Sequence, residues 1–216
     1  MKRCTIIREI NKWYCCISVE DYFSDQKQIE NAVGIDRGIE NLMALSTGEM
    51  VENPRFLNRV TVHIKELQRA LSRKKKDSRN REKARTQLAK SWRKVRNQRL
   101  DYCHKESAKL AARFDTVVFE DLKMDNMVRN HNLAQAIMDA NWGQILRFSA
   151  YKVERCGGRV ILVNPNGTSQ ICSRCGKDVP KDLSVRTHQC PYCGLVLQRH
   201  QLCKNNPRTG SGTGPC

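Results

Sequence analysis

The sequence predicts an α/β fold in which a sheet of short strands packs against helices and is followed by a small cysteine-rich unit. Short apolar segments bounded by turn residues occur at residues 33–36, 42–45, 116–119 and 159–163, as expected for buried strands. Apolar residues at helical steps of three and four separate the later strands. Strands that alternate with helices late in a chain favour a sheet with helices packed on it.

Each element can be placed from its local pattern. Strands are expected at residues 33–36, 42–45, 49–51, 116–119 and 159–163, a helical hairpin over residues 58–113, and a helix from about Leu133 to Arg155. In the hairpin, Val60, Ile64 and Leu67 line one face, and a polar break at residues 76–80 predicts the turn. Trp92 and Trp142 are expected in the core.

The positive charge is concentrated in this predicted hairpin. The chain has 216 residues and a formal net charge of +17. Residues 58–113 contain nineteen Lys and Arg against five Asp and Glu, so they carry most of that excess. A solvated pair of charged helices is the alternative, but such helices mix the two signs in i,i+4 pairs. Like charges at this density favour a nucleic-acid partner whose phosphates neutralise them.

The remaining composition favours a soluble, cytoplasmic protein. Seven of the eleven cysteines are scattered through the chain without the spacing of a disulfide framework, which suits a reducing compartment. No apolar region follows Met1-Lys2-Arg3, and the longest apolar run, residues 13–19, is too short to cross a bilayer. We therefore expect no membrane partner.

Four cysteines near the end form the most specific motif. Cys172 and Cys175 make one Cys-x-x-Cys-Gly unit, and Cys190 and Cys193 make a second, with fourteen residues from Gly176 to Gln189 between them. Two such knuckles supply the four thiolates that a structural Zn²⁺ prefers. Two disulfides, or four unrelated buried thiols, are the alternatives. The histidines His63, His104, His131 and His188 show no ligand spacing and are expected at the surface or in caps.

Two acidic residues end predicted central strands. Asp36 follows Val33-Gly34-Ile35, and Glu120 follows Val117-Val118-Phe119. If these strands are neighbours, the carboxylates lie side by side, and shared divalent cations would offset their repulsion. In nucleases two Mg²⁺ ions about 3.5–4 Å apart serve this purpose and act on the phosphodiester. Taken alone, each acid is more commonly a turn or cap residue.

The combination of motifs resembles a known family. Val33-Gly34-Ile35-Asp36-Arg37-Gly38, a basic helical insert, Val117-Val118-Phe119-Glu120-Asp121-Leu122, Trp142-Gly143, Tyr151-Lys152 and Thr168-Ser169-Gln170-x-Cys-x-x-Cys-Gly follow one another. This order is similar to TnpB, the OrfB-type transposon-encoded protein related to type V CRISPR effectors. The likeness covers nearly all of this chain but only part of a family member, since residues 1–30 resemble the end of an N-terminal β-rich nucleic-acid-binding region.

The resemblance implies an RNase H-like (RuvC) nuclease core at residues 31–166, a zinc ribbon at 167–197 and a last segment at 198–216. It implies an RNA-guided DNA endonuclease that uses Mg²⁺ or Mn²⁺, with a guide RNA and DNA as partners. Asp36 and Glu120 match the first and second catalytic acids. The residues expected to contact nucleic acid are Arg69, Arg73, Lys74, Lys75, Lys76, Arg79, Arg93, Lys94 and Arg96.

The chain departs from the family after the ribbon, where the third catalytic acid belongs. His200 stands in that place, and no carboxylate occurs from Leu183 onward. A neutral imidazole brings no negative charge and favours softer metals than Mg²⁺. Pro207 shortens any helix there, and residues 209–215 have linker-like composition. We expect a chain that does not cleave DNA at normal rates.

Three functions remain open at this point. The first is a TnpB-type nuclease portion that is defective in cleavage. The second is a guide-dependent repressor that binds DNA without cutting it. The third, a plain zinc-ribbon protein of the ribosome or transcription machinery, leaves the two strand-end acids unexplained.

Overall fold

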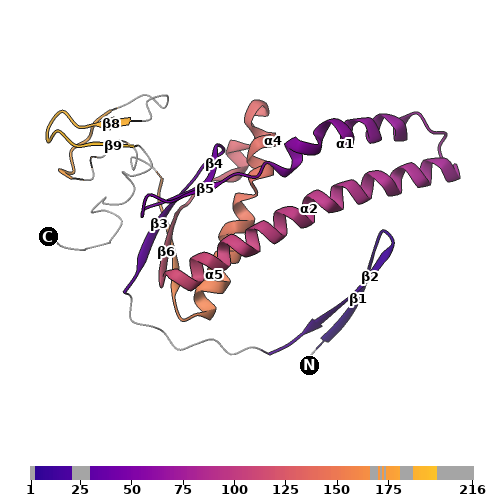
Figure 1. The fold of residues 1–216 in the computed structure, drawn as a ribbon, viewed down its shortest axis with the longest axis horizontal. Helices are drawn as coiled ribbons and strands as arrows, with labels where there is room; N and C mark the ends of the chain where they lie inside the picture. Colours follow the sequence, from indigo (N-terminus) through magenta and orange to yellow (C-terminus); the bar gives the residue numbers. More distant parts are fainter. Residues whose placement is uncertain are drawn as a thin grey trace.

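Five strands form a mixed sheet at the centre of the fold, in the order β5-β4-β3-β6-β7 (Figure 1). The computed structural model describes residues 3–20, 30–165, 170, 172, 174–180 and 187–198. The strands are β3 (Ala32–Arg37), β4 (Asn41–Leu45), β5 (Met50–Glu52), β6 (Thr116–Glu120) and β7 (Arg159–Val163). β3, β4 and β5 pair antiparallel, whereas β3, β6 and β7 pair parallel. The prediction of a mixed α/β sheet is confirmed.

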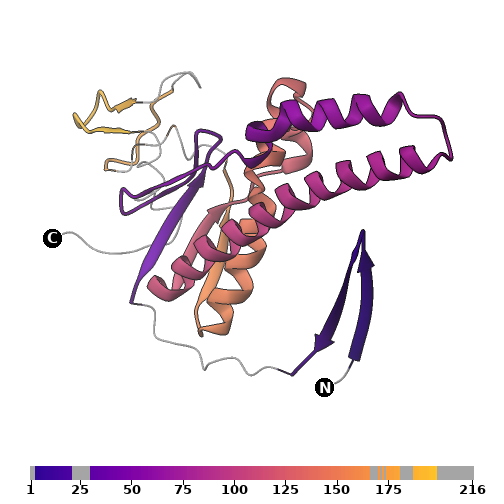
Figure 2. The ribbon, with the colours of Figure 1, turned by 45° about the vertical axis from the view of Figure 1, so that its right-hand side comes forward.

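Helices α2 (Arg79–Arg113) and α5 (Trp142–Arg155) pack against each other beside the sheet (Figure 2). Their contacts bury Leu110, Ile145 and Val153 in one cluster with Val33 and Phe119 of the central strands. Burial of these large apolar side chains is the main favourable contribution to folding. Only glycine fits at residue 158 between α5 and β7, because a Cβ there would lie 2.3 Å from the Asp115 carbonyl oxygen.

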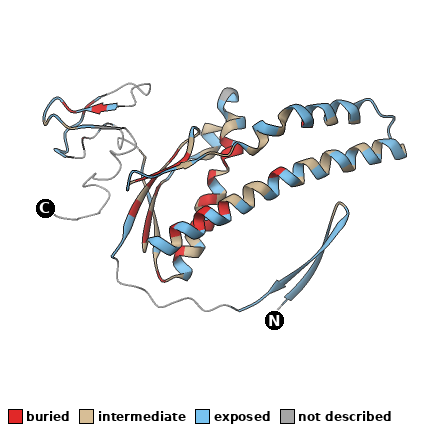
Figure 3. Ribbon diagram, in the orientation of Figure 1, coloured by how far each residue is buried: buried red, intermediate tan, exposed pale blue. Residues whose placement is uncertain are grey.

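The predicted helical hairpin is present and extends away from the sheet. It consists of α1 (Phe56–Ser72) and the first part of α2, joined by a turn at residues 73–78. Ile64 is the buried residue of α1, and no residue of α2 before Val95 is buried (Figure 3). The sixteen residues Arg79–Lys94 therefore form an arm about 24 Å long at the helical rise per residue. Trp92 lies on this arm and is 38% exposed, so the expectation that it is a core residue was wrong.

Polar contacts define both ends of the hairpin turn. The Ser78 side chain accepts a hydrogen bond from the Arg81 backbone N–H at 3.2 Å and so caps α2. The Arg81 guanidinium donates to the carbonyl oxygens of Leu71 and Lys74 at 3.2 and 3.1 Å. A cation at these carbonyls also favours the negative end of the α1 dipole. The turn is therefore locally encoded.

The single helix expected from Leu133 to Arg155 is instead two helices, α4 (His131–Ala140) and α5, preceded by a short α3 (Met124–Met127). Asn141 separates them with φ 56° and ψ 40°, the left-handed region that asparagine tolerates better than most residues. The break allows the Trp142 indole Nε1–H to donate to the Gly38 carbonyl oxygen at 3.2 Å. Trp142 is 2% exposed, which confirms its expected place in the core.

Two smaller sheets complete the described chain. β1 (Arg3–Glu9) and β2 (Lys12–Ser18) form an antiparallel hairpin whose apolar side chains, including Ile6 and Trp13, are exposed. β8 (Thr187–Gln189) pairs with β9 (Val196–Gln198) beside the second cysteine pair. Among the described residues no helix is both long and apolar enough to cross a membrane.

Candidate metal centre and nucleic-acid interface

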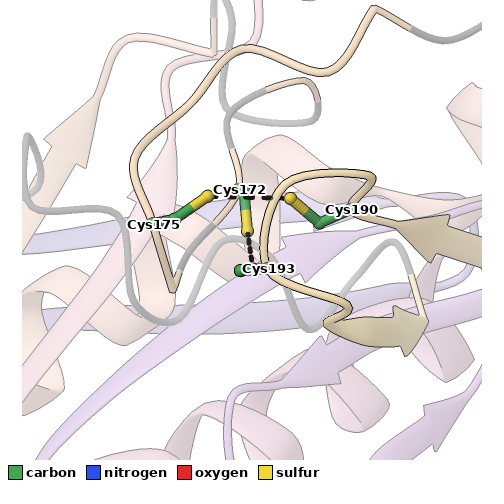
Figure 4. A group of neighbouring side chains, drawn as sticks. All are labelled: Cys172, Cys175, Cys190 and Cys193. Carbon is green, nitrogen blue, oxygen red and sulfur yellow. Dashed lines mark hydrogen bonds between the residues drawn. The ribbon is translucent and has the colours of Figure 1, made fainter.

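The four predicted cysteines converge on one point. The sulfur atoms of Cys172, Cys175, Cys190 and Cys193 all lie within 4.8 Å of one another (Figure 4). The Cys172–Cys193 and Cys175–Cys190 sulfur pairs are each 3.6 Å apart. A tetrahedral site with Zn–S bonds of 2.3 Å requires sulfurs about 3.8 Å apart. The cluster can therefore hold a metal such as zinc.

The two knuckles are alike in their backbone hydrogen bonds. Gly176 N–H donates to the Cys172 carbonyl at 2.9 Å, and Gly194 N–H donates to the Cys190 carbonyl at 3.0 Å. Both glycines have positive φ, 69° and 71°, which residues with a Cβ rarely adopt. This repeat explains why each Cys-x-x-Cys pair ends in glycine.

The electrostatics of the four cysteine side chains favour a bound cation. Burial opposes ionisation of Cys190, but backbone N–H groups of Tyr192 and Cys193 and the neighbouring thiols lower its pKa to about 6. The backbone N–H of Leu195 favours the Cys193 thiolate, yet burial and hydrogen bonds with the other three sulfurs raise its pKa to about 12. Four thiolates so close together repel one another, and a divalent cation removes that repulsion.

His188 lies on β8, two residues before Cys190. Its side chain is fully buried, so the expectation of a surface or cap histidine was wrong. Among the described residues of this segment, Cys172, Val179 and Cys190 form the buried core cluster.

The two predicted acids lie at the same level of neighbouring strands. β3 and β6 are parallel, with Ile35 opposite Phe119, so Asp36 and Glu120 are the next residues in register. Adjacent strands are about 4.8 Å apart. Ile35 and Phe119 point into the core, and because side chains alternate, both acids fall on the other face. The arrangement that the strand-end hypothesis requires is present.

Arg37 is a neighbouring residue that the motif alone did not single out. Its side chain is 6% exposed, its guanidinium lies 5.6 Å from the Phe119 ring centre, and it donates to the Glu120 carbonyl oxygen. Burial lowers the pKa of Arg37, and the charges of Glu120, Asp36 and Asp121 oppose that shift. A cation directly after a strand-end acid was the available sequence signal. Arg37 holds the ends of both strands together and reduces the repulsion between their carboxylates.

An open hollow of about 650 Å³ lies beside Asp36. Ala44 and Met50 line it, and they continue the row of Asp36 across β4 and β5. Arg55 and Trp142 line another part of its wall. Carboxylate oxygens at an accessible, half-buried edge are the donors that Mg²⁺ prefers. His200, the residue in the third position, lies outside the described residues.

The predicted nucleic-acid contacts divide into two groups. Arg69, Arg73, Lys74, Lys75, Lys76 and Arg79 are exposed around the hairpin turn, and Lys94 is exposed farther along α2. Arg96 instead pairs with Glu9 at 2.5 Å, and Arg93 donates to the Glu9 carbonyl oxygen at 3.3 Å. The hydrogen bond from Arg96 lowers the pKa of Glu9. These two arginines also dock the β1–β2 hairpin onto α2.

Arg93 also borders a depression of about 430 Å³ between the β1–β2 hairpin and α2. Lys12, Lys90, Arg93 and Lys94 line it, with Asp101 as the acidic residue of the lining. Its charge is the sign that a phosphate backbone would match.

Fold and site together define an α/β protein with a four-cysteine metal-binding unit and a projecting basic helical arm. The chain belongs to the OrfB/TnpB family: residues 14–131 match the IS605-type OrfB family, described as a probable transposase. Residues 142–201 match the Cas12f1-like TNB domain. The resemblance noted in the sequence is thereby confirmed.

Curated relatives support this membership. The chain is 36% identical over 190 residues to a protein of Streptomyces pristinaespiralis and 31% identical over 192 residues to InsQ of Escherichia coli K12. Both relatives carry the provisional name of RNA-guided DNA endonuclease. The matches cover 87% and 82% of this chain but 47% and 48% of the relatives, so the chain spans about half their length.

Solved structures show the same fold. One is a Cas12f1–sgRNA–target DNA complex, matched with a TM-score of 0.54 at 16% identity over 94% of this chain and 55% of that chain. A CRISPR–Cas12f ternary complex matches with a TM-score of 0.57 at 18% identity over 91% of this chain and 42% of that chain.

Proposed function

We propose that this chain is the RNase H-like (RuvC) portion of an RNA-guided DNA endonuclease of the TnpB type, with residues 31–166 as the nuclease core and 167–197 as a zinc ribbon. The observation that carries the proposal is the register of β3 and β6, which sets Asp36 beside Glu120 at one strand edge. The relatives named as RNA-guided DNA endonucleases and the shared Cas12f fold support it.

In this proposal Asp36 and Glu120 hold divalent Mg²⁺ or Mn²⁺ at the strand edge. The bound ions would activate a water molecule and stabilise the leaving oxygen of a phosphodiester. The protein residues orient the two carboxylates: Arg37 ties the ends of β3 and β6 together through the Glu120 carbonyl oxygen. The hollow beside Asp36 leaves room for a nucleic-acid strand to approach.

The helical arm binds the guide RNA–target DNA duplex by its backbone. Its exposed cations reach about 24 Å beyond the last buried turn of α2. Contacts of this kind are insensitive to sequence, which base pairing between guide and target supplies. The four-cysteine cluster carries a structural Zn²⁺ and takes no part in cleavage.

The third position favours a binding role over an efficient nuclease. His200 replaces the acid expected there, and no carboxylate occurs from Leu183 onward. Two acids without the third hold the metal pair weakly, because each lost carboxylate removes one negative ligand. The second candidate is therefore a nuclease-dead, guide-dependent repressor that keeps the same binding surface.

One experiment separates these roles. The purified chain, with copurified RNA identified, is incubated with labelled target DNA in Mg²⁺ and in Mn²⁺, alongside His200→Asp and its matched negative control, the double variant His200→Asp with Asp36→Asn. We expect binding by all three proteins and cleavage in His200→Asp alone. Clear cleavage by the unmodified chain would refute the defect. Absence of any RNA or DNA binding would refute the proposed function.

A further inference from the structure

Three helices meet at the carboxylate of Asp139 on α4. This side chain is 5% exposed. Its two oxygens each accept a hydrogen bond from Leu57 N–H at 3.0 Å, and Oδ2 also accepts one from Asn58 N–H at 3.2 Å. On α2, Arg99 donates to Oδ1 from Nε at 3.0 Å and from Nη2 at 2.7 Å. One buried carboxylate therefore connects α4 to the start of α1 and to the middle of α2.

These contacts supply what α1 lacks. Arg55, the residue before the helix, has left-handed φ 48° and makes no side-chain cap, and the first turn contains no acid. The first N–H groups of a helix need acceptors and favour negative charge. Asp139 meets both needs from another helix. Arg99 pairs its charge, and without that cation a buried carboxylate would be costly.

The joint lies at the base of the projecting part of the hairpin, where α1 begins beside the middle of α2. Beyond it α1 buries Ile64 alone, and α2 buries no residue before Val95 among those that the structure describes. Little apolar packing therefore restrains the arm beyond this point. A pivot of about 15° at the joint would move the end of a 24 Å arm by about 6 Å.

A short series of contacts connects this joint to the ends of β3 and β6, where Asp36 and Glu120 lie. Two residues after Asp139, Asn141 contacts the Cys103 sulfur of α2 at 3.8 Å. The next residue, Trp142, donates to the Gly38 carbonyl oxygen, two residues after Asp36. The element that holds the start of α1 is thus anchored beside the strand that carries the first candidate catalytic acid.

We infer that Asp139 is a positioning residue: it fixes the direction of the basic hairpin relative to the edge that carries Asp36 and Glu120. Its consequence for nucleic acid rests on the proposed function, since a duplex held by the arm must cross that edge to be cut. The inference about direction stands on the protein alone.

The test measures the direction of the hairpin in the full chain without nucleic acid. Spin labels on genetically encoded ketone amino acids are placed at positions 75, in the hairpin turn, and 47, in the β4–β5 turn, which leaves the native cysteines intact. Pulsed electron–electron double resonance then gives the distribution of distances between the two labels. We expect one narrow distribution in the parent and, in Asp139→Asn, a distribution shifted or broadened by about 6 Å.

Two further variants serve as controls for the distance measurement. Asp101→Asn makes the same chemical change on α2 at an exposed carboxylate that pairs with Lys105, and we expect it to match the parent. The double variant Asp139→Asn with Arg99→Gln avoids an unpaired buried charge, so it is used if Asp139→Asn does not fold, and we expect the same shift. A parent-like distribution in the folded variants overturns the inference.

A second measurement separates this inference from the proposed function. Hydroxyl-radical footprinting of a 20-base-pair RNA–DNA duplex reports how much of it the protein covers. We expect the double variant to bind within about threefold of the parent, because the arm keeps its charges, but to protect a shorter stretch. If the labels move and the parent binds no duplex, the joint is upheld and the proposed function fails.

Discussion

Replacing Lys74, Lys75 and Lys76 with glutamine tests whether the hairpin turn contacts phosphates. All three lysines are exposed at the end of the arm, and the change leaves its buried contacts intact. Each phosphate that a lysine neutralises contributes about 0.9 to the slope of log K against log salt concentration. If all three contact a duplex, the slope falls by about 2.7 and binding at 0.15 M salt weakens by about 100-fold.

The assay is fluorescence anisotropy of a labelled 20-base-pair duplex titrated with the protein at 50 to 300 mM salt. The control variant carries Lys123→Gln, Arg147→Gln and Lys177→Gln, three exposed cations away from the hairpin. It has the same net charge as the test variant. An equal fall in slope for both would show that net charge alone drives binding. A parent slope in the test variant would refute contact at the turn.

Three further outcomes are expected. Zinc analysis should find one metal per chain, and Cys190→Ser should lose it. That variant should also speed amide hydrogen exchange at Gly194 but not in β6, because the core of the four-cysteine unit is separate from the core of the sheet. Cys16→Ser is the control, and metal retained by Cys190→Ser would contradict the site. In urea denaturation, Trp142→Phe should lower the free energy of unfolding by about 2 kcal/mol, because the hydrogen bond to Gly38 is lost. Trp92→Phe should change it by less than about 0.5 kcal/mol, and equal effects would refute the difference between the buried and the exposed tryptophan. Burial, followed by the charges of Glu106 and Glu52, raises the pKa of Tyr102 to about 12. The stability that the neutral Tyr102 side chain contributes is therefore complete below pH 10 and is lost as the pH rises toward 12. Tyr102→Phe should remove the step at highest pH from the tyrosine titration followed at 295 nm, and an unchanged titration would contradict the raised pKa.

The strand-end acids and the cysteine pairs could be predicted because their geometry is local. A Cys-x-x-Cys-Gly unit encodes its own knuckle through a glycine of positive φ. Asp36 and Glu120 each end a continuous apolar run, so their places on the strands follow from the alternation of side chains. That they are neighbours depends on β3 pairing with β6 across the whole hairpin, which no local pattern contains.

The errors come from tertiary contacts. The continuous helix expected from Leu133 to Arg155 is broken at Asn141, and the bond from the Trp142 indole to Gly38, a residue far away in the chain, stabilises the broken form. Asp139 was overlooked because an acid in a helix reads as a solvated charge. Arg99 lies on the apolar face of α2, where a charged residue is unexpected. Its partner Asp139 is on another helix, so the reason for this position becomes visible only when the helices are packed together.

The projecting hairpin separates the reach of this protein from its stability. Its outer turns bury no residue of α2 before Val95, and the Ser78 and Arg81 contacts close its end locally. Helical turns could therefore be added to or removed from both helices together without repacking the sheet. Under the proposed function, the length of nucleic acid that the arm would span changes by about 5 Å for each turn, while the ends of β3 and β6 and the cysteine cluster stay as they are.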